Sequence, residues 1–402
     1  MSNLTNFRPE FVHPPGSNGI CPKRIGRLDG VFQKYIDDGE MSGASVIIVR
    51  NGQTAHLKTY GLADIETGRA VEIDTLFRIA SMTKPITSFA VLQLIEEGKA
   101  LLNDPISAYL PEFRGGKVLE SVPDSDAFRL VDAKRPMTIR HLLTHTSGLC
   151  YGGSEPLTAF YRVANITGGF EGFETLERAM MRLGKMPLQF HPGEGWAYGY
   201  STDVLGRLVE VVSGMELDQY FKTRFFEPLQ MNDTDFRLSP EKAARLAQVY
   251  TKAEDGSLQV YPAQYPYAPP QLYLSGGAGL SSTLLDYARF LQMTLNGGEL
   301  EGERVLSRRS IELALENHIG GLTPMGGPGF KFGLGFQIHV DPGQSGSPSS
   351  KGAYEWGGYW HTTFWVDPVK QLFVVKMSQI YPSDHLDDHP KLRHLTYQAL
   401  LD

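Results

Sequence analysis

The stretch "FRIASMTKP", residues 77–85, contains a Ser-x-x-Lys tetrapeptide formed by Ser81 and Lys84. A helical pattern continues from it to residue 99, and Pro85 fits a helix only within the first turn. The pattern therefore places Ser81 at the N-terminus of a helix. Residues three apart share one helix face, with Cβ atoms about 5–6 Å apart. We expect Lys84 to reach the Ser81 hydroxyl.

This spacing suits nucleophilic catalysis, because a serine hydroxyl is a weak nucleophile until a base removes its proton. An ordinary lysine is protonated at pH 7, and neutralising it costs about 4.6 kcal/mol. Burial and the positive end of a helix dipole both lower the pKa of a lysine. The same helix end directs backbone N–H groups toward a developing oxyanion. Because the tetrapeptide also arises about once or twice by chance in such a chain, the hypothesis needs further motifs.

A second motif, "HPGEGWAYGYSTDVLG" at residues 191–206, places Tyr198 near the start of a helix. The phenol of a tyrosine ionises more readily beside a cationic lysine. Tyr198 is therefore a candidate to carry the proton from Ser81 to the leaving group. Taken alone, the motif is more typical of a tyrosine packed in a core or on a loop.

A third motif, "YEWGGYWHTTFW" at residues 354–365, contains Trp356, Gly357 and Gly358 at the predicted opening of a strand. Glycines on an edge strand allow the backbone of a ligand to approach closely. The N–H group of Tyr359 would then be a second donor to the oxyanion. A glycine-weakened edge strand without a site is the plainer interpretation of these residues.

The wider pattern places β structure at both ends of the chain and helices in the middle. Strand-like runs flank Asn51-Gly52 and Asp367-Pro368, which predicts two hairpins. Helices are predicted in residues 26–40, 81–99, 130–149, 201–214 and 281–298, and a Gly/Ser/Pro loop at 342–353. One sheet built from both ends, with an inserted helical domain, satisfies this order. We expect an arm at 1–24, a sheet domain from 25–100 and 236–402, and a mostly helical domain at 101–235.

Composition narrows the class of protein. The 402 residues are 41% hydrophobic and 21% charged, with a net charge of −7, so no electrostatic feature favours nucleic acid or an anionic membrane. No apolar run has the length of a membrane span. The N-terminal residues do not resemble a secretory signal, and Cys21 and Cys150 form no disulfide framework. These features together predict a cytoplasmic protein.

Four segments together resemble the class C β-lactamase and DD-peptidase branch of the serine β-lactamase and penicillin-binding protein superfamily. They are "FRIASMTKPITSFAVLQLIEEGK", "IRHLLTHTSGL", "PGEGWAYGYSTDVLG" and "GGAGLSSTLLDYARF", and the resemblance runs from about residue 25 to residue 395. It implies an α+β fold with a central antiparallel sheet built from both chain ends, flanked by helices, and a mostly helical insertion.

Two departures from that pattern concern the substrate. The β-lactamases carry Lys-Thr-Gly where this chain has Trp356-Gly357-Gly358, and Tyr-x-Asn where it has Tyr198-Gly199-Tyr200. Their lysine and asparagine hold the carboxylate and amide of β-lactam or peptidoglycan substrates, whereas tryptophan offers an apolar wall with one polar tip. The Trp-x-Gly variant resembles the family VIII carboxylesterases and favours neutral esters.

The resemblance also implies a role for each matching residue. Ser81 would be the nucleophile, Lys84 and Tyr198 would move its proton, and the amides of Ser81 and Tyr359 would form the oxyanion hole. We favour Lys84 as the base that removes the Ser81 proton, and Tyr198 as the relay and acid. The predicted pocket residues are Trp356, Gly357, Gly358 and Tyr200.

Other kinds of site find less support in the sequence. No Gly-x-Ser-x-Gly pentapeptide is present, and "GQSGS" fails at its last position. His141 and His145 lack the His-Glu-x-x-His pattern, so we expect structural roles for them. The segment "SDHLDDHPKLRH", residues 383–394, is interpreted as solvated rather than as a metal site. No cofactor and no metal are expected.

The resulting prediction is a serine carboxylesterase that hydrolyses short-chain esters through an acyl-enzyme on Ser81, with weak β-lactam hydrolysis as a side activity. Its partner would be a small-molecule ester. Two alternatives stay open: an amide hydrolase or acyltransferase that uses the same acyl-enzyme, and a non-catalytic binding protein that kept the fold. Retention of Ser81, Lys84 and Tyr198 argues against the last of these.

Overall fold

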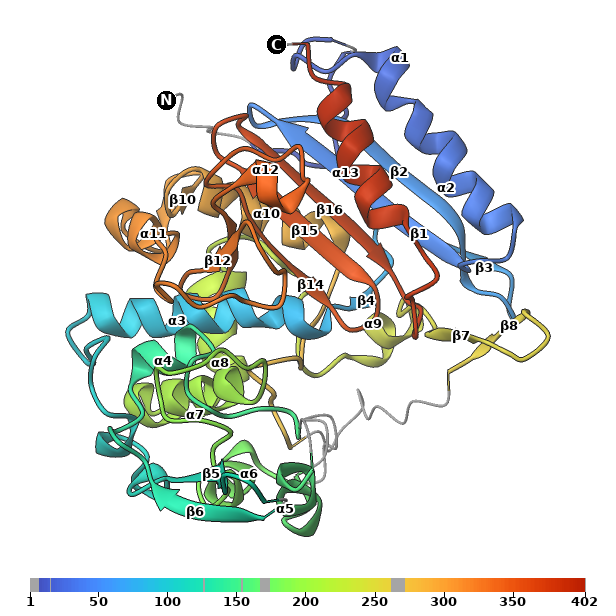
Figure 1. Ribbon diagram of the computed structural model, residues 1–402. Helices are drawn as coiled ribbons and strands as arrows, with labels where there is room; N and C mark the ends of the chain where they lie inside the picture. Colours follow the sequence, from blue (N-terminus) through green and yellow to red (C-terminus); the bar gives the residue numbers. More distant parts are fainter. Residues whose placement is uncertain are drawn as a thin grey trace.

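An eight-stranded antiparallel sheet is the centre of the fold (Figure 1), in the order β12-β13-β14-β15-β16-β1-β2-β3. The computed structural model describes residues 7–14, 16–125, 127–152, 155–166, 174–261 and 272–401. The strands are β1 (Gly43–Arg50), β2 (Gln53–Asp64), β3 (Arg69–Ala70), β12 (Phe330–Phe332), β13 (Gln337–His339), β14 (Tyr354–Gly358), β15 (Thr362–Asp367) and β16 (Leu372–Ser378). Because β1 pairs with β16, the two halves of the chain meet in one sheet, as predicted.

Both predicted hairpins are present. Asn51 and Gly52 join β1 to β2 with positive φ angles of 54° and 72°, the backbone that a two-residue hairpin turn requires. The second hairpin joins β15 to β16, and the Asp367 carboxylate holds its turn by accepting from the N–H groups of Val369 and Lys370.

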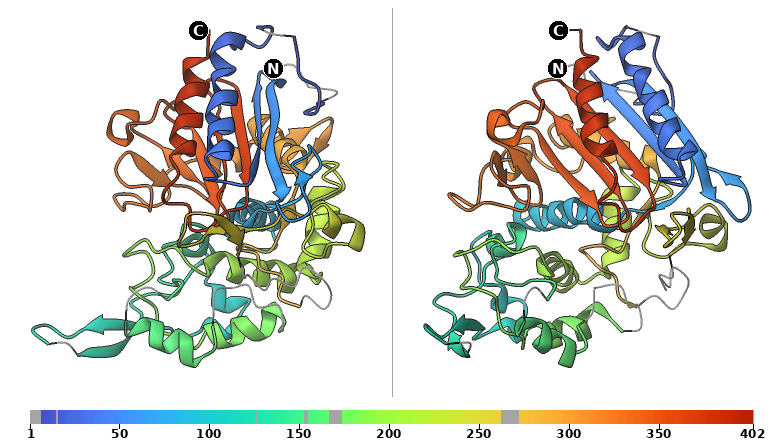
Figure 2. Two further views of the ribbon diagram at one scale, coloured as in Figure 1. Left: turned by 90° about the vertical axis from the view of Figure 1, so that its right-hand side faces the viewer. Right: turned by 45° about the vertical axis from the view of Figure 1, so that its right-hand side comes forward.

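The sheet is covered on both faces, which explains why β1 is buried along its whole length. On one face, Val46 and Ile48 pack with residues of α2 (Arg27–Asp37) and α13 (Asp388–Gln398). On the other face, Ile47 and Val49 belong to the larger core. That core includes α3 (Thr83–Glu96) and α10 (Leu284–Leu295). Figures 1 and 2 show α1, α2 and α13 together on the first face.

Helix α3 is the central helix of the molecule. Its residues from Thr83 to Leu94 are buried, because the sheet lies on one side and α7 (Ser201–Ser213) on the other (Figure 1). The short strand β4 (Phe77–Arg78) precedes α3 and pairs with β9 (Ser281–Ser282), which leads into α10. This pairing fixes the start of α3 between the sheet and the helical part.

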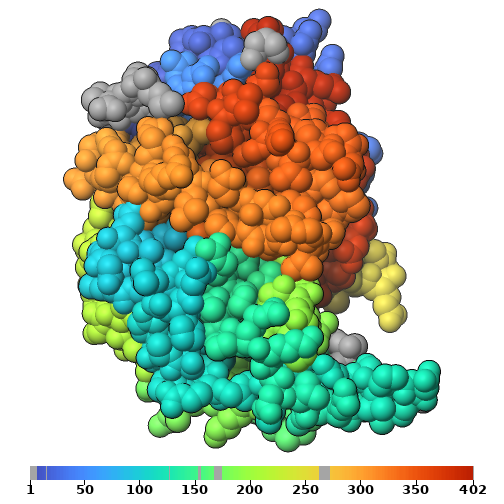
Figure 3. All heavy atoms as spheres, turned by 60° about the vertical axis from the view of Figure 1, so that its left-hand side comes forward, coloured from blue at the N-terminus to red at the C-terminus, as the bar shows by residue number. Residues whose placement is uncertain are grey.

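The middle of the chain is mostly helical but carries one hairpin. Its elements are the 3-10 turns η2 (Ile106–Ala108) and η3 (Pro111–Phe113), strands β5 (Lys117–Ser121) and β6 (Phe128–Asp132), helices α4 (Ile139–Leu143), α5 (Leu157–Val163), α6 (Leu176–Leu183), α7 and α8 (Leu217–Phe221), and the π-helix η4 (Lys222–Phe226). The β5–β6 hairpin projects from the body in Figure 3. The division of the chain into an arm and two domains stays a prediction.

The predicted helix at 130–149 is largely wrong. Residues 130–132 belong to β6, and α4 begins only at Ile139. Pro136 disfavours the helical region for the residue before it, and Thr138 then starts the helix by accepting from the His141 N–H. The His141 ring in turn accepts from the Thr138 N–H, which completes a capping box.

The remaining elements connect these layers. They are α1 (Pro22–Ile25), η1 (Ala80–Met82), α9 (Pro240–Ala244), β7 (Tyr250–Lys252), β8 (Leu258–Val260), β10 (Glu299–Leu300), β11 (Glu303–Arg304), α11 (Arg308–Ala314) and α12 (Pro342–Ser345). The predicted loop at 342–353 thus begins with a single helical turn. Within the described ranges, no helix is both long and apolar enough to cross a bilayer.

A partly buried ion pair fastens α13 to the sheet. Glu355 of β14 meets Arg393 Nη2 at 2.6 Å and His339 Nε2 at 2.8 Å, and it accepts from Gln337 Nε2 at 3.0 Å. Burial by itself raises the pKa of Glu355, but the charge of Arg393 and the hydrogen bond from His339 outweigh it and lower the pKa to about 2. The folded protein therefore favours the ionised carboxylate.

Glu355→Gln should reduce the free energy of unfolding by an amount that depends on pH. Since the pKa of Glu355 is depressed on folding, its stabilising contribution is full above the unfolded value and is lost as pH falls toward 2. The difference between wild type and variant should shrink by about 2 kcal/mol from pH 7 to pH 3. Urea denaturation at both pH values measures this, with Glu312→Gln of an exposed ion pair as control. A difference that does not change with pH would contradict the assignment.

Candidate active site

Ser81 lies on the 3-10 turn η1, immediately before α3, which is the predicted position. The preceding residue, Ala80, is 1% exposed and has a φ of 42°, in the left-handed region that non-glycine residues seldom adopt. Such strain persists only where the surroundings hold it in place, and it is common at functional sites. Ser81 is thus presented on a strained, well-held turn at the N-terminal end of a buried helix.

Lys84 points back at Ser81. Its Nζ donates to Ser81 Oγ at 3.1 Å, to the hydroxyl of Tyr151 at 3.1 Å and to the backbone oxygen of Gly277 at 2.7 Å. The side chain is 2% exposed. Lys84 Nζ therefore has three oxygen partners, and the sequence-based expectation of a Ser81–Lys84 contact is met.

Tyr198 lies beside Lys84, but its hydroxyl is directed elsewhere. Lys84 Nζ lies 4.6 Å from the centre of the Tyr198 ring, and the Tyr198 hydroxyl accepts from Trp356 Nε1 at 3.3 Å. Tyr198 also stacks on Trp196, with an interplanar angle of 6°. The structure thus brings Ser81, Lys84 and Tyr198 together, with the Tyr198 ring rather than its hydroxyl facing the lysine.

Tyr151 is the tyrosine whose hydroxyl contacts Lys84, and the sequence motifs gave it no role in proton transfer. Its side chain is 39% exposed, yet its hydroxyl lies inward against the lysine. Burial and the proximity of Tyr198 and Asp203 raise the pKa of Tyr151 well above its usual value. Tyr151 therefore remains a neutral phenol. Tyr151 lies in the segment "SGLCYGG", whose glycines predict a loop and no catalytic role.

Asp203 is a buried carboxylate behind Lys84 that the sequence did not single out. Its Oδ1 accepts from Ser275 Oγ at 2.6 Å and from the Gly277 N–H at 3.4 Å, and the residue is 1% exposed. A Cβ on Gly277 would lie 2.7 Å from Asp203 Oδ2 and 3.4 Å from Lys84 Nζ, so both groups adjoin this glycine. Burial raises the pKa of Asp203, while the hydrogen bond from Ser275 and the charge of Lys84 oppose that rise.

The end of β14 contacts the turn that carries Ser81. A Cβ on Gly358 would lie 2.4 Å from the backbone oxygen of Ile79, so only glycine permits this approach. Tyr359 follows directly, and its amide and that of Ser81 therefore lie on adjoining segments. Adjoining segments are one requirement of a two-donor oxyanion hole.

Two details of the third motif differ from the prediction. The strand β14 ends at Gly358 rather than opening at Trp356, and β14 is not an edge strand, because β13 pairs with Tyr354 and Glu355. Residues 356–358 pair with β15 alone, so this half of the strand has one open edge. An open edge at these positions can still receive the backbone or carbonyl of a ligand.

The predicted pocket residues occupy different depths. Trp356 is 8% exposed and packs against Tyr198 and Phe332, with ring centres 5.3 Å apart in both cases. Tyr200 is 2% exposed, and its ring lies 4.7 Å from that of Tyr151. The structure thus places Tyr200 behind Tyr151, and its assignment to the substrate pocket stays a prediction.

The histidines of the helical part have structural contacts, as expected. His141 caps α4, and His145 packs between the rings of Trp196, Tyr198 and Phe332. Burial, together with the charge of Lys84, lowers the pKa of His145 well below its usual value. His145 is therefore a neutral packing residue behind Tyr198.

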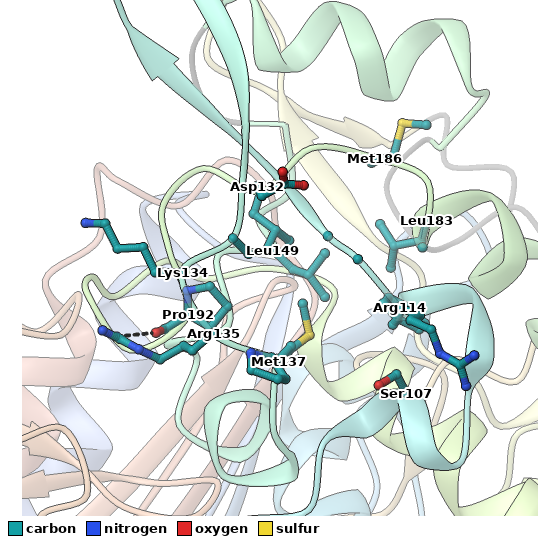
Figure 4. A pocket seen from close by; sticks show the side chains of 17 residues that line it. Ser107, Arg114, Asp132, Lys134, Arg135, Met137, Leu149, Leu183, Met186 and Pro192 are labelled. Carbon is teal, nitrogen blue, oxygen red and sulfur yellow. Dashed lines mark hydrogen bonds between the residues drawn. The ribbon is translucent and has the colours of Figure 1, made fainter.

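A separate pocket of about 270 Å³ lies in the middle part of the chain, with Leu149 in its lining (Figure 4). Its apolar lining includes Met137, Leu149 and Leu183. Arg135 on its rim donates to the Pro192 backbone oxygen at 2.8 Å and pairs with Glu194. Because Leu149 and not Tyr151 belongs to its lining, we do not assign this pocket to the site around Ser81.

Comparison with known proteins agrees with this fold. The profile of the beta-lactamase family matches residues 28–398, and the chain belongs to that family. Esterase EstB from Burkholderia gladioli is 34% identical over 88% of this chain and 89% of its own length. Monacolin J acid methylbutanoyltransferase from Aspergillus terreus is 29% identical over 88% of this chain and 90% of its own length.

Solved structures show the same fold. EstCE1, a hydrolase with promiscuous acyltransferase activity, superposes with a TM-score of 0.82 at 27% identity over 94% of this chain and 99% of its own. Simvastatin synthase LovD from Aspergillus terreus gives a TM-score of 0.78 at 26% identity over 93% of this chain and 98% of its own. The predicted fold class and superfamily are thereby confirmed, and an esterase among the relatives agrees with the predicted family VIII branch.

Proposed function

We propose that this protein is a serine carboxylesterase that hydrolyses short-chain esters of small molecules through an acyl-enzyme on Ser81. The observation that carries the proposal is the 3.1 Å contact between Lys84 Nζ and Ser81 Oγ at the start of a buried helix. The likeness to Esterase EstB over 88% of the chain supports ester chemistry in particular.

In the proposed reaction, Ser81 Oγ attacks the ester carbonyl while Lys84, reacting as the unprotonated amine, accepts the Ser81 proton. The N–H groups of Ser81 and Tyr359 stabilise the tetrahedral oxyanion, in a site where each such donor is worth about 2.7–4 kcal/mol. Tyr198 passes the proton to the leaving alcohol, and water then attacks the acyl-enzyme with the same groups acting in reverse. Asp203, close to Lys84, favours the ammonium form that results from each proton transfer.

The substrate class follows from Trp356. This indole occupies the strand position where a β-lactamase would place a lysine, and its N–H is engaged by the Tyr198 hydroxyl. Since tryptophan carries no charge, a neutral ester suits the pocket better than a carboxylate-bearing β-lactam. The cytoplasm remains the proposed compartment, in keeping with two cysteines, Cys21 and Cys150, that are free thiols.

Acyl transfer is the second candidate function, favoured by the methylbutanoyltransferase relative and by EstCE1. The first half of the reaction is the same, and an alcohol replaces water in the second half. The ratio of the two outcomes depends on how well the site holds an acceptor alcohol against water. The binding-protein alternative is weakened by the intact Ser81–Lys84 contact.

The test combines labelling with turnover. A fluorophosphonate probe should add one phosphonyl group, and peptide mapping should place it on Ser81. Turnover of p-nitrophenyl butyrate should exceed that of the β-lactam nitrocefin by orders of magnitude, and added alcohols should reveal any transfer through the ester product. Labelling elsewhere would contradict the proposal, and labelling at Ser81 with nitrocefin preferred would favour the amide hydrolase.

The two tyrosines near Lys84 should differ in their effect. Tyr198→Phe should lower kcat by about 10²- to 10³-fold, because it removes the proposed proton relay. Tyr151→Phe removes one acceptor from Lys84 and should lower kcat by only about tenfold. Each variant is the matched control of the other, since each loses a single hydroxyl. The reverse order of effects in steady-state kinetics would assign the relay to Tyr151.

A further inference from the structure

A cluster of polar side chains lies behind the hairpin that carries Tyr359, outside the site described above. Lys376 of β16 and Asp388 of α13 form an ion pair at 2.8 Å, and both side chains are 0% exposed. Asp388 Oδ1 meets His361 Nε2 at 2.7 Å, and the His361 ring stacks on that of His389 at 4.1 Å. The cluster thus joins the sheet, the first residue of α13 and the β14–β15 turn.

The cationic group of this cluster is the side chain of Lys376, and a metal ion is not needed to balance the Asp388 charge. The ligand atoms of His361, Asp388 and His389 lie within 4.8 Å of one another, close enough to suggest a metal. Lys376 Nζ, however, lies 2.8 Å from Asp388 and 3.4 Å from His389 Nε2, so the ammonium occupies the position a metal would need. The interpretation of 383–394 as a solvated segment is therefore wrong for Asp388, which is fully buried.

The turn that the cluster holds has an unusual backbone. Only Tyr359, Trp360 and His361 connect β14 to β15, and His361 has a φ of 72°. The last residue of a three-residue hairpin loop adopts this left-handed conformation, and glycine is the usual choice there. A histidine at this position costs conformational energy, so its side chain and carbonyl must be held by their contacts.

Those contacts reach the turn from several sides. The His361 backbone oxygen accepts from Lys376 Nζ at 3.0 Å and from Ser378 Oγ at 2.9 Å, while its N–H donates to the Gly358 oxygen at 3.0 Å. The Trp360 oxygen accepts from the Ile380 N–H at 3.2 Å. Tyr359 stacks on Tyr381, with ring centres 4.1 Å apart.

The charges of the cluster are fixed by burial and pairing. Burial, assisted by the charge of Lys376, lowers the pKa of His361 to about 4, so the ring is neutral at pH 7 and its Nε2–H donates to Asp388. Burial alone raises the pKa of Asp388, but the Lys376 charge and the His361 hydrogen bond outweigh it and hold the pKa below its usual range. The carboxylate therefore stays ionised between its two partners.

We propose that Lys376, Asp388 and Ser378 are positioning residues of the reaction: through His361 they fix the β14–β15 turn, and with it the Tyr359 N–H in the oxyanion hole. The inference rests on the proposed function, because it assumes that this amide receives the oxyanion. A donor displaced by a fraction of an ångström stabilises the transition state less while the ground-state ester binds as before.

Three variants test the proposal. Ser378→Ala removes one donor to the His361 carbonyl and leaves the ion pair in place. Asp388→Asn breaks the ion pair and risks instability. The double variant Lys376→Met with Asp388→Leu removes both charges, which is far better tolerated than removing one. Tyr397→Phe, at the other end of α13, is the control, since it breaks a comparable link from α13 to Asp367.

The expected signature is a loss in kcat without a change in KM. The double variant should lose about tenfold to a hundredfold in kcat on p-nitrophenyl butyrate, with KM within about twofold. Ser378→Ala should lose about threefold to tenfold. The Ki of a trifluoromethyl ketone, which forms a tetrahedral adduct, should rise by the same factor as kcat falls, and the rate of fluorophosphonate labelling should fall with it.

A purely structural role predicts something different. In that case kcat would follow stability, so a double variant that unfolds near the wild-type temperature would recover wild-type kcat, and Tyr397→Phe would lose as much activity as Ser378→Ala. Wild-type kcat and Ki in both Ser378→Ala and the double variant would overturn the proposal. Labelling of the wild type away from Ser81 would instead refute the proposed function itself.

Discussion

Ser81→Ala should lower kcat for p-nitrophenyl butyrate by about 10⁴- to 10⁶-fold and abolish fluorophosphonate labelling, while the protein stays folded. The physical reason is that Ser81 carries the hydroxyl that contacts Lys84 and would form the acyl-enzyme. The remaining donors, including the Tyr359 amide, would still bind the ester and polarise it, which leaves a small residual rate.

The matched control for this variant lies on the same helix. Ser88→Ala removes a hydroxyl that is also buried on α3 but faces Gly335 instead of the site. Its kcat should stay within about twofold of wild type. Thermal unfolding of both variants separates loss of chemistry from loss of structure. Retention of more than a few per cent of wild-type turnover in Ser81→Ala would show that the ester is cleaved by another group.

Lys84→Met should lower kcat by about 10³- to 10⁵-fold, because it removes the nitrogen that lies 3.1 Å from Ser81 Oγ and would accept its proton. Methionine preserves most of the volume of the lysine in this fully packed position. KM should change little, since Lys84 contacts Ser81, Tyr151 and Gly277, and none of these contacts depends on the ester. Steady-state kinetics with the ester measures both constants.

The same variant should also reveal the role of Asp203. Removing the Lys84 ammonium leaves a buried carboxylate without its nearby cation, so Lys84→Met should be less stable than wild type at pH 7. Adding Asp203→Asn should restore part of that stability but none of the activity. Equal activity in wild type and Lys84→Met would exclude Lys84 as the base. A double variant no more stable than Lys84→Met would show that the two groups do not interact.

Much of the site was predictable because it depends on local backbone geometry. The spacing of Ser81 and Lys84 on one helix face, and the position of Pro85 in its first turn, follow from the helical repeat alone. The Asn51-Gly52 turn is equally local, since both residues tolerate a positive φ. The false helix at 130–149 shows the limit of this approach, because β6 is stabilised by its pairing with β5 and not by its own pattern.

The sequence by itself determined Ser81 as the candidate nucleophile, the lysine one turn away, the two hairpins and the likeness to the beta-lactamase family. Only the tertiary structure decided which groups surround Lys84: Tyr151 and Gly277 lie 67 and 193 residues away in the chain. It likewise assembled the cluster of His361, Lys376 and Asp388 behind the oxyanion turn. The physical reason is the distance along the chain over which each kind of interaction acts. Helical and hairpin periodicity acts over a few residues, whereas the contacts of a buried charge are set by how distant segments pack.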